Sequence, residues 1–506
     1  MQDRTDENST VNRVNALGGV GGHGVVLPVS DVNARPIAAR YNMSRRDLLL
    51  MGAYGAMGAV GGGLLAGCST TRSPKHIFPP TSTQLKAGSL PYPKLKPGTD
   101  TIPEIDHIVV LMEENRSFDH LLGMLGRGNG FKLGPNGLPT EANPYRNGEL
   151  VRAFPDPNPC RTEAQPVQSW YDSHFQYDHG TNQGFAKSAS GPAAMGYYTG
   201  ATIPFTYGLA RTFPIGDNYF CSVMGPTFPN RRYLLAATSS GLVKDDFSAP
   251  YPANGTIMDM LDSYNISWRD YYSDLATVDL FLLGSGAKKA PAGSVVHISQ
   301  FYADAQAGTL PAFSLIDPQF TQSGSTEGNS EGEGQDIQFG DVFISKVVNA
   351  LMSGPKWSKT VLVITYDEHG GYFDHVPPPN AVPPDGIPPN APADEQYDGF
   401  ARYGFRVPAI VVSPYSKANF VSHQVYDHTS ILRLVETKWN LPALTARDAN
   451  ANNMLDFLDF SHAVFATPPT LPSPANPAHL DSCLTAGPGG SPSPGVIPPP
   501  SAIVHA

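Results

Sequence analysis

Cysteine is scarce in this sequence, with four residues among 506. None of the four stands in a C-x-x-C pair, so the spacing offers no thiolate metal site of that kind, and four are too few for a disulfide-built scaffold. One bridge is compatible with this number, and Cys160–Cys483 is the pairing we expect. Cys221 lies inside the apolar segment YFCSVMG and is expected to be an ordinary buried thiol.

Charge is also low, and basic charge lowest of all. Charged residues make up 16% of the chain, below the usual quarter, while hydrophobic residues make up 41% and suffice for a large core. Lys and Arg number 34 against 45 Asp and Glu, which gives a net charge of -11. No dense Lys/Arg run occurs outside the N-terminal region, so we expect no nucleic acid as the main partner and a weakly charged globular enzyme instead.

A strongly hydrophobic run is missing at the one place where an apolar segment follows basic residues. Residues 43–68, MSRRDLLLMGAYGAMGAVGGGLLAGC, contain seven glycines between Gly52 and Gly67, which makes a transmembrane anchor a poor fit. The pair Arg45 and Arg46 before this stretch is typical of a twin-arginine export signal. The final LAGC resembles a lipoprotein cleavage box, so Cys68 is the expected lipidation site.

The export signal predicts where the protein acts: in the periplasm or as a cell-envelope lipoprotein, with secretion as an alternative. Residues 1–42 form a polar extension that is either disordered or upstream of a true start at Met43. Residues 69–100 are expected to be a Pro-rich linker and 472–506 a Pro/Gly/Ser-rich tail. The interval 101–471 has no internal repeat and no linker-like break, and is expected to form one catalytic domain.

Four short apolar segments inside that domain predict the strands of its sheet. They lack polar/apolar alternation, as strands covered on both faces do, and they comprise 108–112, 313–316, 360–366 and 407–412. Amphipathic stretches at 256–264, 339–352 and 429–439 have the spacing of crossover helices. The predicted fold class is α/β, with a central, mostly parallel sheet flanked by helices.

Acidic and amide side chains follow two of these strands. Glu113-Glu114-Asn115 ends the first and Asp367-Glu368-His369 ends the third, and ligands of open α/β sheets bind beyond the carboxyl ends of strands. Carboxylate and amide oxygens suit one divalent ion: Ca²⁺, Mg²⁺ or Mn²⁺, with Zn²⁺ if a histidine joins. The alternative is a salt-bridged cluster without a metal, in which the cation is Arg116, Arg231 or Arg232.

The segment MGPTFPNRRY, residues 224–233, carries a candidate nucleophile. Its Gly and Pro residues predict a tight turn, and the residues that follow predict a helix whose first N–H groups favour an anion. The Thr227 hydroxyl on this turn can attack phosphorus once it is activated, and Asn230 can hold a phosphoryl oxygen. The alternative for Thr227 is a helix-capping hydroxyl.

Histidines beside acidic or glycine residues form a third feature. An adjacent acidic group can orient or charge the ring, which suits phosphate binding or protonation of a leaving group. The candidates are His179, His297, His369, His375 and His428.

With these segments in hand, the chain resembles the bacterial phosphoesterase family that contains the secreted phospholipases C and the respiratory-burst-inhibiting acid phosphatase. The resemblance runs from about Ile105 to Phe460 and rests on six motifs in order. They are EENRSFDH, MGYYTGATIPFTYGLA, GDNYFCSVMGPTFPNRRY, ISWRDYY, TYDEHGGYFDHVPPP and DHTSILRLVETKWNLP. The family is similar in fold to the alkaline phosphatase superfamily, an α/β sandwich.

The resemblance implies a role for each matching residue. Thr227 would be nucleophile and metal ligand, and Asn230 would contact the phosphoryl group as a catalytic and substrate-binding residue. The remaining metal ligands would be Glu114, Asn115, Asp367 and Glu368. The catalytic histidines would be His179, His297 and His375, with His369 and His428 binding substrate.

One departure from the family pattern concerns the segment before the helix that starts near Asp336. Family members carry an acidic-His-Pro-Pro stretch where this sequence has GNSEGEGQDIQFG, so a histidine at the rim is missing. Threonine at the nucleophile position favours a phospholipase C, which releases diacylglycerol and a phosphorylated head group from lipids such as phosphatidylcholine.

Three rival hypotheses stay open. They are an acid phosphatase acting on monoesters, a non-catalytic lipid-anchored binding protein, and a sulfatase. The sulfatase is less favoured, because no Cys or Ser stands in the C/S-x-P-x-R arrangement. The expected partners are a phospholipid or small phosphoester and a membrane surface met through substrate or lipid anchor.

Overall fold

The computed structural model describes residues 84–156, 159, 166–281, 290–321, 328–332, 335–477 and 502–505. The expected extension and export signal lie outside these residues. So do three of the cysteines, Cys68, Cys160 and Cys483, so the proposed disulfide and lipidation site lie outside the described residues too. Cys221 is a buried free thiol.

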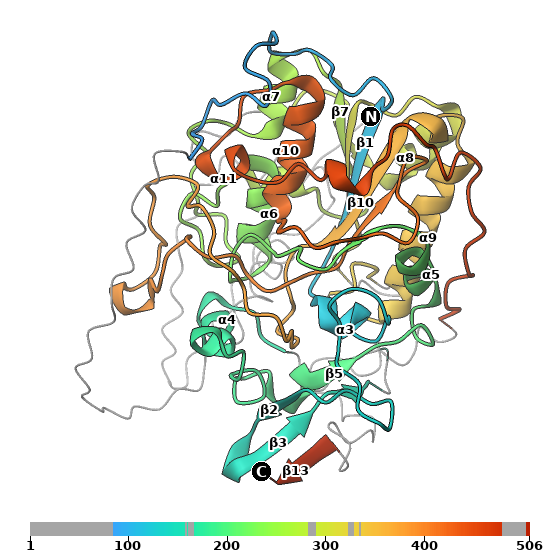
Figure 1. Ribbon diagram of the computed structural model, residues 1–506. Coiled ribbons are helices and arrows are strands. Elements are labelled where there is room, and N and C mark those ends of the chain that lie inside the picture. The colour runs from blue at the N-terminus through green and yellow to red at the C-terminus, as the bar shows by residue number, and fades with distance from the viewer. Residues whose placement is uncertain are drawn as a thin grey trace, which may run out of the picture.

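An eight-stranded sheet forms the centre of the molecule, in the order β12-β6-β11-β10-β1-β9-β7-β8 (Figure 1). The strands in that order are β12 (Val421–Ser422), β6 (Ile215–Gly216), β11 (Ala409–Val412), β10 (Thr360–Tyr366), β1 (His107–Glu113), β9 (Phe313–Asp317), β7 (Trp268–Tyr272) and β8 (Val295–His297). From β10 to β8 all neighbouring strands are parallel. Every residue of β1 and β10 is buried, as their unbroken apolar sequences predict.

Helices cover both faces of the sheet, which makes the α/β sandwich that the sequence predicts. On one face lie α5 (Pro204–Thr212), α8 (Ile298–Ala307) and α9 (Ile337–Ser353), and on the other α6 (Thr227–Ala236), α7 (Ile257–Ser263) and α10 (His428–Trp439). The three predicted helices coincide with α7, α9 and α10 to within a few residues at each end.

The strand predicted at 407–412 is present as β11, but it is not parallel to its neighbour, contrary to what the four apolar segments would suggest. β11 runs antiparallel to β10, with Leu362 opposite Val412 and Thr365 opposite Ala409. The chain between the two strands contains only the short 3₁₀ turn Ala393–Glu395 and no crossover helix. Because a parallel return needs such a crossover, the chain re-enters the sheet from the edge at which β10 ended.

A smaller unit lies beyond the carboxyl edge of the sheet, at the bottom of Figure 1. It comprises β2 (Ala142–Pro144), β3 (Glu149–Arg152) and β13 (Ile503–His505) in one small sheet, and β4 (Phe154–Pro155) paired with β5 (Gly196–Tyr197). Two short helices, α3 (Phe118–Leu122) and α4 (Trp170–Tyr177), lie between this unit and the main sheet.

Part of the segment expected to be a linker is held against the domain. The side chain of Asn440, which follows α10, donates to the carbonyls of Tyr92 and Leu95 at 3.1 and 3.0 Å, and it accepts from the Tyr92 N–H at 2.9 Å. The Thr101 N–H donates to the Lys438 carbonyl at 2.7 Å. Residues 84–101 therefore cover the end of α10 and extend the folded unit toward the N-terminus.

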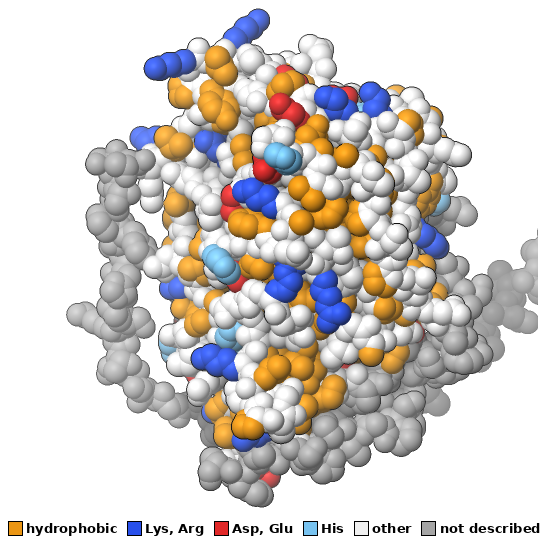
Figure 2. Space-filling model, turned by 45° about the vertical axis from the view of Figure 1, so that its right-hand side comes forward, with side chains coloured by type: hydrophobic (Ala, Val, Ile, Leu, Met, Phe, Trp, Pro, Cys, Tyr) orange, Lys and Arg blue, Asp and Glu red, His pale blue; other side chains and the backbone are white. Residues whose placement is uncertain are grey.

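Surface charge on the face drawn in Figure 2 is mixed. Lys and Arg side chains there are spread among hydrophobic and uncharged ones, without a continuous basic stripe over the described residues. Within the part of the chain that the structure describes, no helix has both the length and the hydrophobicity that crossing a membrane requires.

Candidate active site

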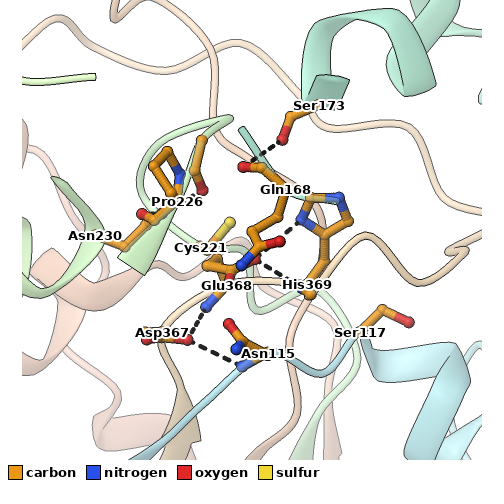
Figure 3. Close-up of polar contacts among 12 residues, drawn as sticks. Asn115, Ser117, Gln168, Ser173, Cys221, Pro226, Asn230, Asp367, Glu368 and His369 are labelled. Carbon is orange, nitrogen blue, oxygen red and sulfur yellow. Dashed lines mark hydrogen bonds and ion pairs between the residues drawn. The ribbon is translucent and has the colours of Figure 1, made fainter. Parts of the chain in front are cut away.

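The ends of β1 and β10 meet at one edge of the sheet. Glu113 and Tyr366 are opposite each other in the parallel register, so the residues that follow them lie side by side. The Asn115 N–H donates to the Asp367 Oδ1 at 3.1 Å, which joins the two strand ends directly (Figure 3). We call the set Glu114, Asn115, Asp367 and Glu368 the acidic rim.

Asn115 and Gly370 show how tightly the rim is built. Asn115 has a left-handed backbone, with φ of 62°, and its buried side-chain Oδ1 accepts no hydrogen bond from the residues that the structure describes. Gly370 has φ of +64°, and a Cβ at this position would lie 2.1 Å from the Asn115 carbonyl oxygen. Only glycine can hold both this conformation and this approach. The turn at Gly370 therefore holds the Asn115 backbone in place, and with it the side chain whose Oδ1 is available as a ligand.

Asp367 forms an ion pair with an arginine, which is what the salt-bridged alternative to a metal site predicts. Its Oδ2 lies 3.2 Å from the Arg231 Nε, and its Oδ1 also accepts from the Glu368 N–H at 2.7 Å. Arg231 reaches further to Asp317 at the end of β9, at 3.3 Å. The arginine thus ties α6 to two strand ends of the sheet.

The other two arginines considered do not pair with the rim carboxylates. Arg116 donates to the Asn115 carbonyl at 2.7 Å, and Arg232 donates to the Pro250 carbonyl at 2.7 Å. One guanidinium, that of Arg231, therefore faces several acidic groups.

The acidic groups exceed the positive charge that faces them. Burial and the charge of Asp367 raise the pKa of Glu114 to about 8, although Arg231 opposes the shift. Burial, followed by the charge of Glu331, raises the pKa of Glu113, and burial raises the pKa of Asp367. Desolvated carboxylates of this kind gain from a second cation.

A divalent ion fits this excess of negative charge. Asn115 offers an unoccupied oxygen, and Glu114 and Glu368 offer carboxylates, which are the ligands that hard cations prefer. Asp367 has both oxygens engaged by protein donors, so it contributes through the remaining lone pairs. The donor set therefore fits one cation of the Ca²⁺, Mg²⁺ or Mn²⁺ kind.

A second acidic group of the described residues has closer ligand spacing but already holds a cation. Asp119, Asp374 and His375 bring ligand atoms within 4.8 Å of one another. Arg406 pairs there with Asp374 at 2.8 Å and with Asp119 at 3.0 Å, all with buried side chains. Arg406 already supplies positive charge to this group, whereas at the rim the acidic groups outnumber the one guanidinium, so the rim fits a divalent ion better.

Thr227 begins α6 and lies beside the rim. It is 8% exposed and stands four residues before Arg231, so both side chains project from the same face of the helix. Arg231 contacts Asp367 from that face, so Thr227 stands on the side of α6 that is nearer the rim. The N–H of Phe228 donates to Asp245 at 2.7 Å, so a carboxylate also sits at this helix start.

Asn230 is committed to the turn that carries Thr227. Its amide nitrogen donates to the carbonyls of Gly225 and Pro226, both at 3.0 Å, and its oxygen accepts from the Val223 N–H at 2.9 Å (Figure 3). The side chain is completely buried. These contacts give Asn230 a positioning role, different from the direct phosphoryl contact expected from the sequence.

Two of the histidines are internal supports of the rim. His428 lies 2.7 Å from the Asp367 carbonyl through Nε2 and 3.2 Å from the Tyr219 hydroxyl through Nδ1. His369 lies 2.7 Å from the Gln176 side chain. Both are buried, and burial lowers the pKa of His428 to about 4 and that of His369 to about 3. Both nitrogens of His428 and the Nε2 of His369 are engaged by protein groups, so these neutral rings support the rim, where the sequence predicts substrate binding.

The three histidines expected to be catalytic contact other groups than the rim residues. His375 joins Asp119 at 2.7 Å in the group with Arg406. His297 is exposed and caps α8, three strands from β1 and hence about 14 Å away at the usual strand spacing. His179 is exposed in a short 3₁₀ turn. None of these side chains contacts a rim residue among the described interactions.

Sequence reasoning missed several supporting residues. Gln176 of α4 reaches His369, Ser330 donates to the Glu114 carboxylate at 2.9 Å, and Asp245 caps the start of α6. Gly332 stands in the segment that lacks the family's His-Pro-Pro, and a Cβ there would lie 2.6 Å from Glu114. The departure from the family pattern thus falls directly against the rim, and this anomaly was the one signal that could have found Ser330.

Fold and site together define an α/β enzyme whose sheet edge carries an acidic rim, held by Arg231 of the helix that begins at Thr227. The chain belongs to the Phosphoesterase family, whose model matches residues 105–442. It is accordingly a hydrolase acting on phosphoric ester bonds.

Relatives over most of the chain agree with this assignment. Phospholipase C A of Mycobacterium tuberculosis (strain ATCC 25618 / H37Rv) is 32% identical over 440 residues, covering 74% of this chain and 81% of the relative. Non-specific phospholipase C6 of Arabidopsis thaliana is 34% identical over 381 residues, covering 70% and 72%. A solved structure of a protein in the alkaline phosphatase superfamily from Vibrio parahaemolyticus covers 74% of both chains, at 10% identity and a TM-score of 0.34.

Proposed function

We propose that the protein is a metal-dependent phospholipase C that works through a phospho-threonine. The observation that carries the proposal is the placement of Thr227 at the start of α6, on the helix face from which Arg231 reaches the rim. The named relatives are phospholipases C, which favours a phosphodiester of a phospholipid such as phosphatidylcholine as substrate.

The proposed reaction has two steps. The Thr227 oxygen attacks phosphorus, the bond from phosphorus to the glycerol oxygen breaks, and the glycerol oxygen leaves with a proton as diacylglycerol. Water then attacks the phospho-threonine, releases the phosphorylated head group and returns the proton to the hydroxyl. A divalent ion bound at the rim would offset the negative charge of the phosphoryl oxygens and favour the deprotonated hydroxyl.

The chain's own groups orient the reactants. Asn230 fixes the turn before Thr227, and Asp245 accepts from the Phe228 N–H and so holds the start of α6. Glu114, Asn115, Asp367 and Glu368 would hold the ion. Arg231 holds Asp367 in place, and the neutral His428 holds the Asp367 backbone.

The test is paired hydrolysis of p-nitrophenylphosphorylcholine and p-nitrophenyl phosphate, with and without chelator, from pH 5 to 8. We expect diester turnover that chelator abolishes and that Thr227→Ala lowers at least about 10³-fold. Thr212→Ala, which removes a hydroxyl at the far end of α5, is the matched control and should stay active. Full activity of Thr227→Ala would contradict the mechanism, and cleavage of the monoester alone would make the enzyme an acid phosphatase.

We also propose export by the twin-arginine route, followed by lipid attachment at Cys68. Residues 43–68 support it through Arg45, Arg46 and the LAGC box. Replacing both arginines by lysine should keep the protein inside the cell in a fractionation experiment, and Cys68→Ser should release it from the envelope membrane. Unchanged fractionation of both variants would contradict the proposal.

A further inference from the structure

Helix α4 exposes two of its aromatic residues and buries two polar ones, while its first residue, Trp170, is buried. Ser173 and Gln176 are completely buried, whereas Tyr171 is 53% and Phe175 43% exposed. Tyr171 and Phe175 stand four residues apart on one face, with their rings stacked at 6.4 Å between centroids. This pattern is the reverse of an ordinary surface helix. Exposed aromatics gathered in this way mark a contact surface.

A loop of the long β10–β11 connection adds a third aromatic to this face. Tyr397 is 45% exposed, and its ring lies flat on His174 of α4 at 3.9 Å, with 9° between the planes. The Trp170 indole N–H donates to the Glu395 carbonyl at 2.7 Å and anchors the loop to the helix. Tyr397 also has a left-handed backbone, with φ of 46°, which is uncommon for a bulky residue. We call Tyr171, Phe175 and Tyr397 the aromatic patch.

The inner face of the same helix supports the active site. Gln176 lies 2.7 Å from His369, the residue that follows Glu368 of the rim. Figure 3 shows Ser173 of the same helix beside Gln168, whose carbonyl accepts from the Ser173 hydroxyl at 3.1 Å. The aromatic patch is therefore separated from the rim by the thickness of one helix, about 10 Å.

Acidic residues lie beside the aromatic patch, with Asp172 next to Tyr171 in α4 and Asp394 and Glu395 in the short turn just before Tyr397. Burial and the charges of Glu395 and Asp394 raise the pKa of Tyr397 to about 12, and Asp172 adds to the same shift. Arg402, the nearby guanidinium, is paired with Asp398 at 2.7 Å, so its charge is offset. The patch thus combines exposed rings with net negative charge, in a chain whose net charge is -11.

We propose that the aromatic patch docks the enzyme on lipid surfaces rich in phosphatidylcholine. The inference rests on the proposed function, because it concerns how a phospholipase C meets its aggregated substrate. Tyr and Phe rings are suited to the membrane–water interface, and aromatic faces with nearby carboxylates attract the quaternary ammonium groups that cover such a surface. Anionic lipids would be repelled by Asp172, Asp394 and Glu395.

The experiment compares vesicle binding of full-length proteins that all carry Cys68→Ser and Thr227→Ala, so that neither a lipid anchor nor hydrolysis contributes. Sucrose-loaded vesicles of phosphatidylcholine or of phosphatidylglycerol are sedimented with each protein. The test variant is Tyr171→Ser/Phe175→Ser. Its matched control is Leu133→Ser/Leu138→Ser, which removes two comparably exposed apolar side chains elsewhere. Each pair of substitutions is also made in protein that keeps Thr227, and these variants are assayed on soluble p-nitrophenylphosphorylcholine.

We expect the test pair to weaken binding to phosphatidylcholine vesicles about tenfold, with the control pair unchanged and phosphatidylglycerol bound poorly by all. Turnover of the soluble diester should be the same for both pairs. Unchanged vesicle binding of the test pair, an equal loss in the control pair, or equal binding to phosphatidylglycerol would overturn the proposal. Absence of soluble turnover in the unaltered enzyme would overturn the proposed function alone, since the vesicle assay does not depend on it.

Discussion

Two asparagines of the site show that residue type does not define a role. Asn115 has a buried oxygen that accepts no hydrogen bond, whereas Asn230 has its amide engaged by four backbone contacts around one turn. The sequence predicts Asn115 as a metal ligand and Asn230 as a contact of the phosphoryl group. Hydrogen bonds of a side chain to distant backbone depend on the folded turn, so only the structure separates a free ligand from a support.

Asn115→Ala is expected to weaken metal binding. Residues that merely orient a ligand change metal affinity by about 10–100-fold, and loss of an oxygen ligand should cost at least as much. Titration of metal-stripped protein by calorimetry measures this, with Asn349→Ala on the exposed side of α9 as the control. Equal affinities for Asn115→Ala and the unaltered protein would remove Asn115 from the ligand set.

Asn230→Ala is expected to lower stability and kcat together while leaving metal affinity unchanged. Four hydrogen bonds to the turn are lost, at about 1 kcal/mol each less any relaxation, so we expect a loss of about 2–4 kcal/mol. Urea unfolding and steady-state kinetics measure the two effects. A variant that unfolds like the original enzyme but binds phosphate more weakly would restore Asn230 to the direct role that the sequence suggested.

At the level of elements, strand ends were predictable and strand direction was not. Apolar runs without alternation gave β1, β9 and β10, and their polar ends met at one edge as parallel pairing requires. β11 has the same kind of sequence but runs the other way, because its direction depends on the connection before it. The histidines show a similar limit, because an Asp-His pair in the sequence does not say which of several acidic clusters the ring will join.

The turn after β10 carries a prediction of its own. Gly370→Ala would strain a left-handed backbone and press a Cβ against the Asn115 carbonyl, so the oxygen of Asn115 would be displaced. We expect a lower unfolding temperature and weaker metal binding. Gly386→Ala, in the same β10–β11 connection but with open space around its Cβ, is the control and should leave both unchanged. Undiminished metal binding in Gly370→Ala would mean that the turn does not set the rim.

At the scale of the whole molecule, the rim connects four elements: the ends of β1 and β10 and the helices α6 and α10. A metal ion bound at the rim should therefore affect global stability. Asp367 contacts Asn115, Arg231 of α6 and His428 of α10 through side chain or backbone. A metal ion there would bind only the folded protein, because the ligands come together only on folding. Its binding free energy therefore adds to the free energy of unfolding.

Metal ion at 100 times its dissociation constant should stabilise the protein by about 2.7 kcal/mol, seen as a rise in unfolding temperature that chelator reverses. The rise should be larger at pH 8 than at pH 5. Glu114, whose pKa is raised to about 8, is protonated in the metal-free protein at pH 5, and the ion must displace that proton. Scanning fluorimetry with and without chelator at both pH values measures the effect, and Glu368→Gln should reduce it. A shift that is equal at both pH values and unchanged in Glu368→Gln would place the ion elsewhere, with the Asp119–Asp374–His375 group as the next candidate.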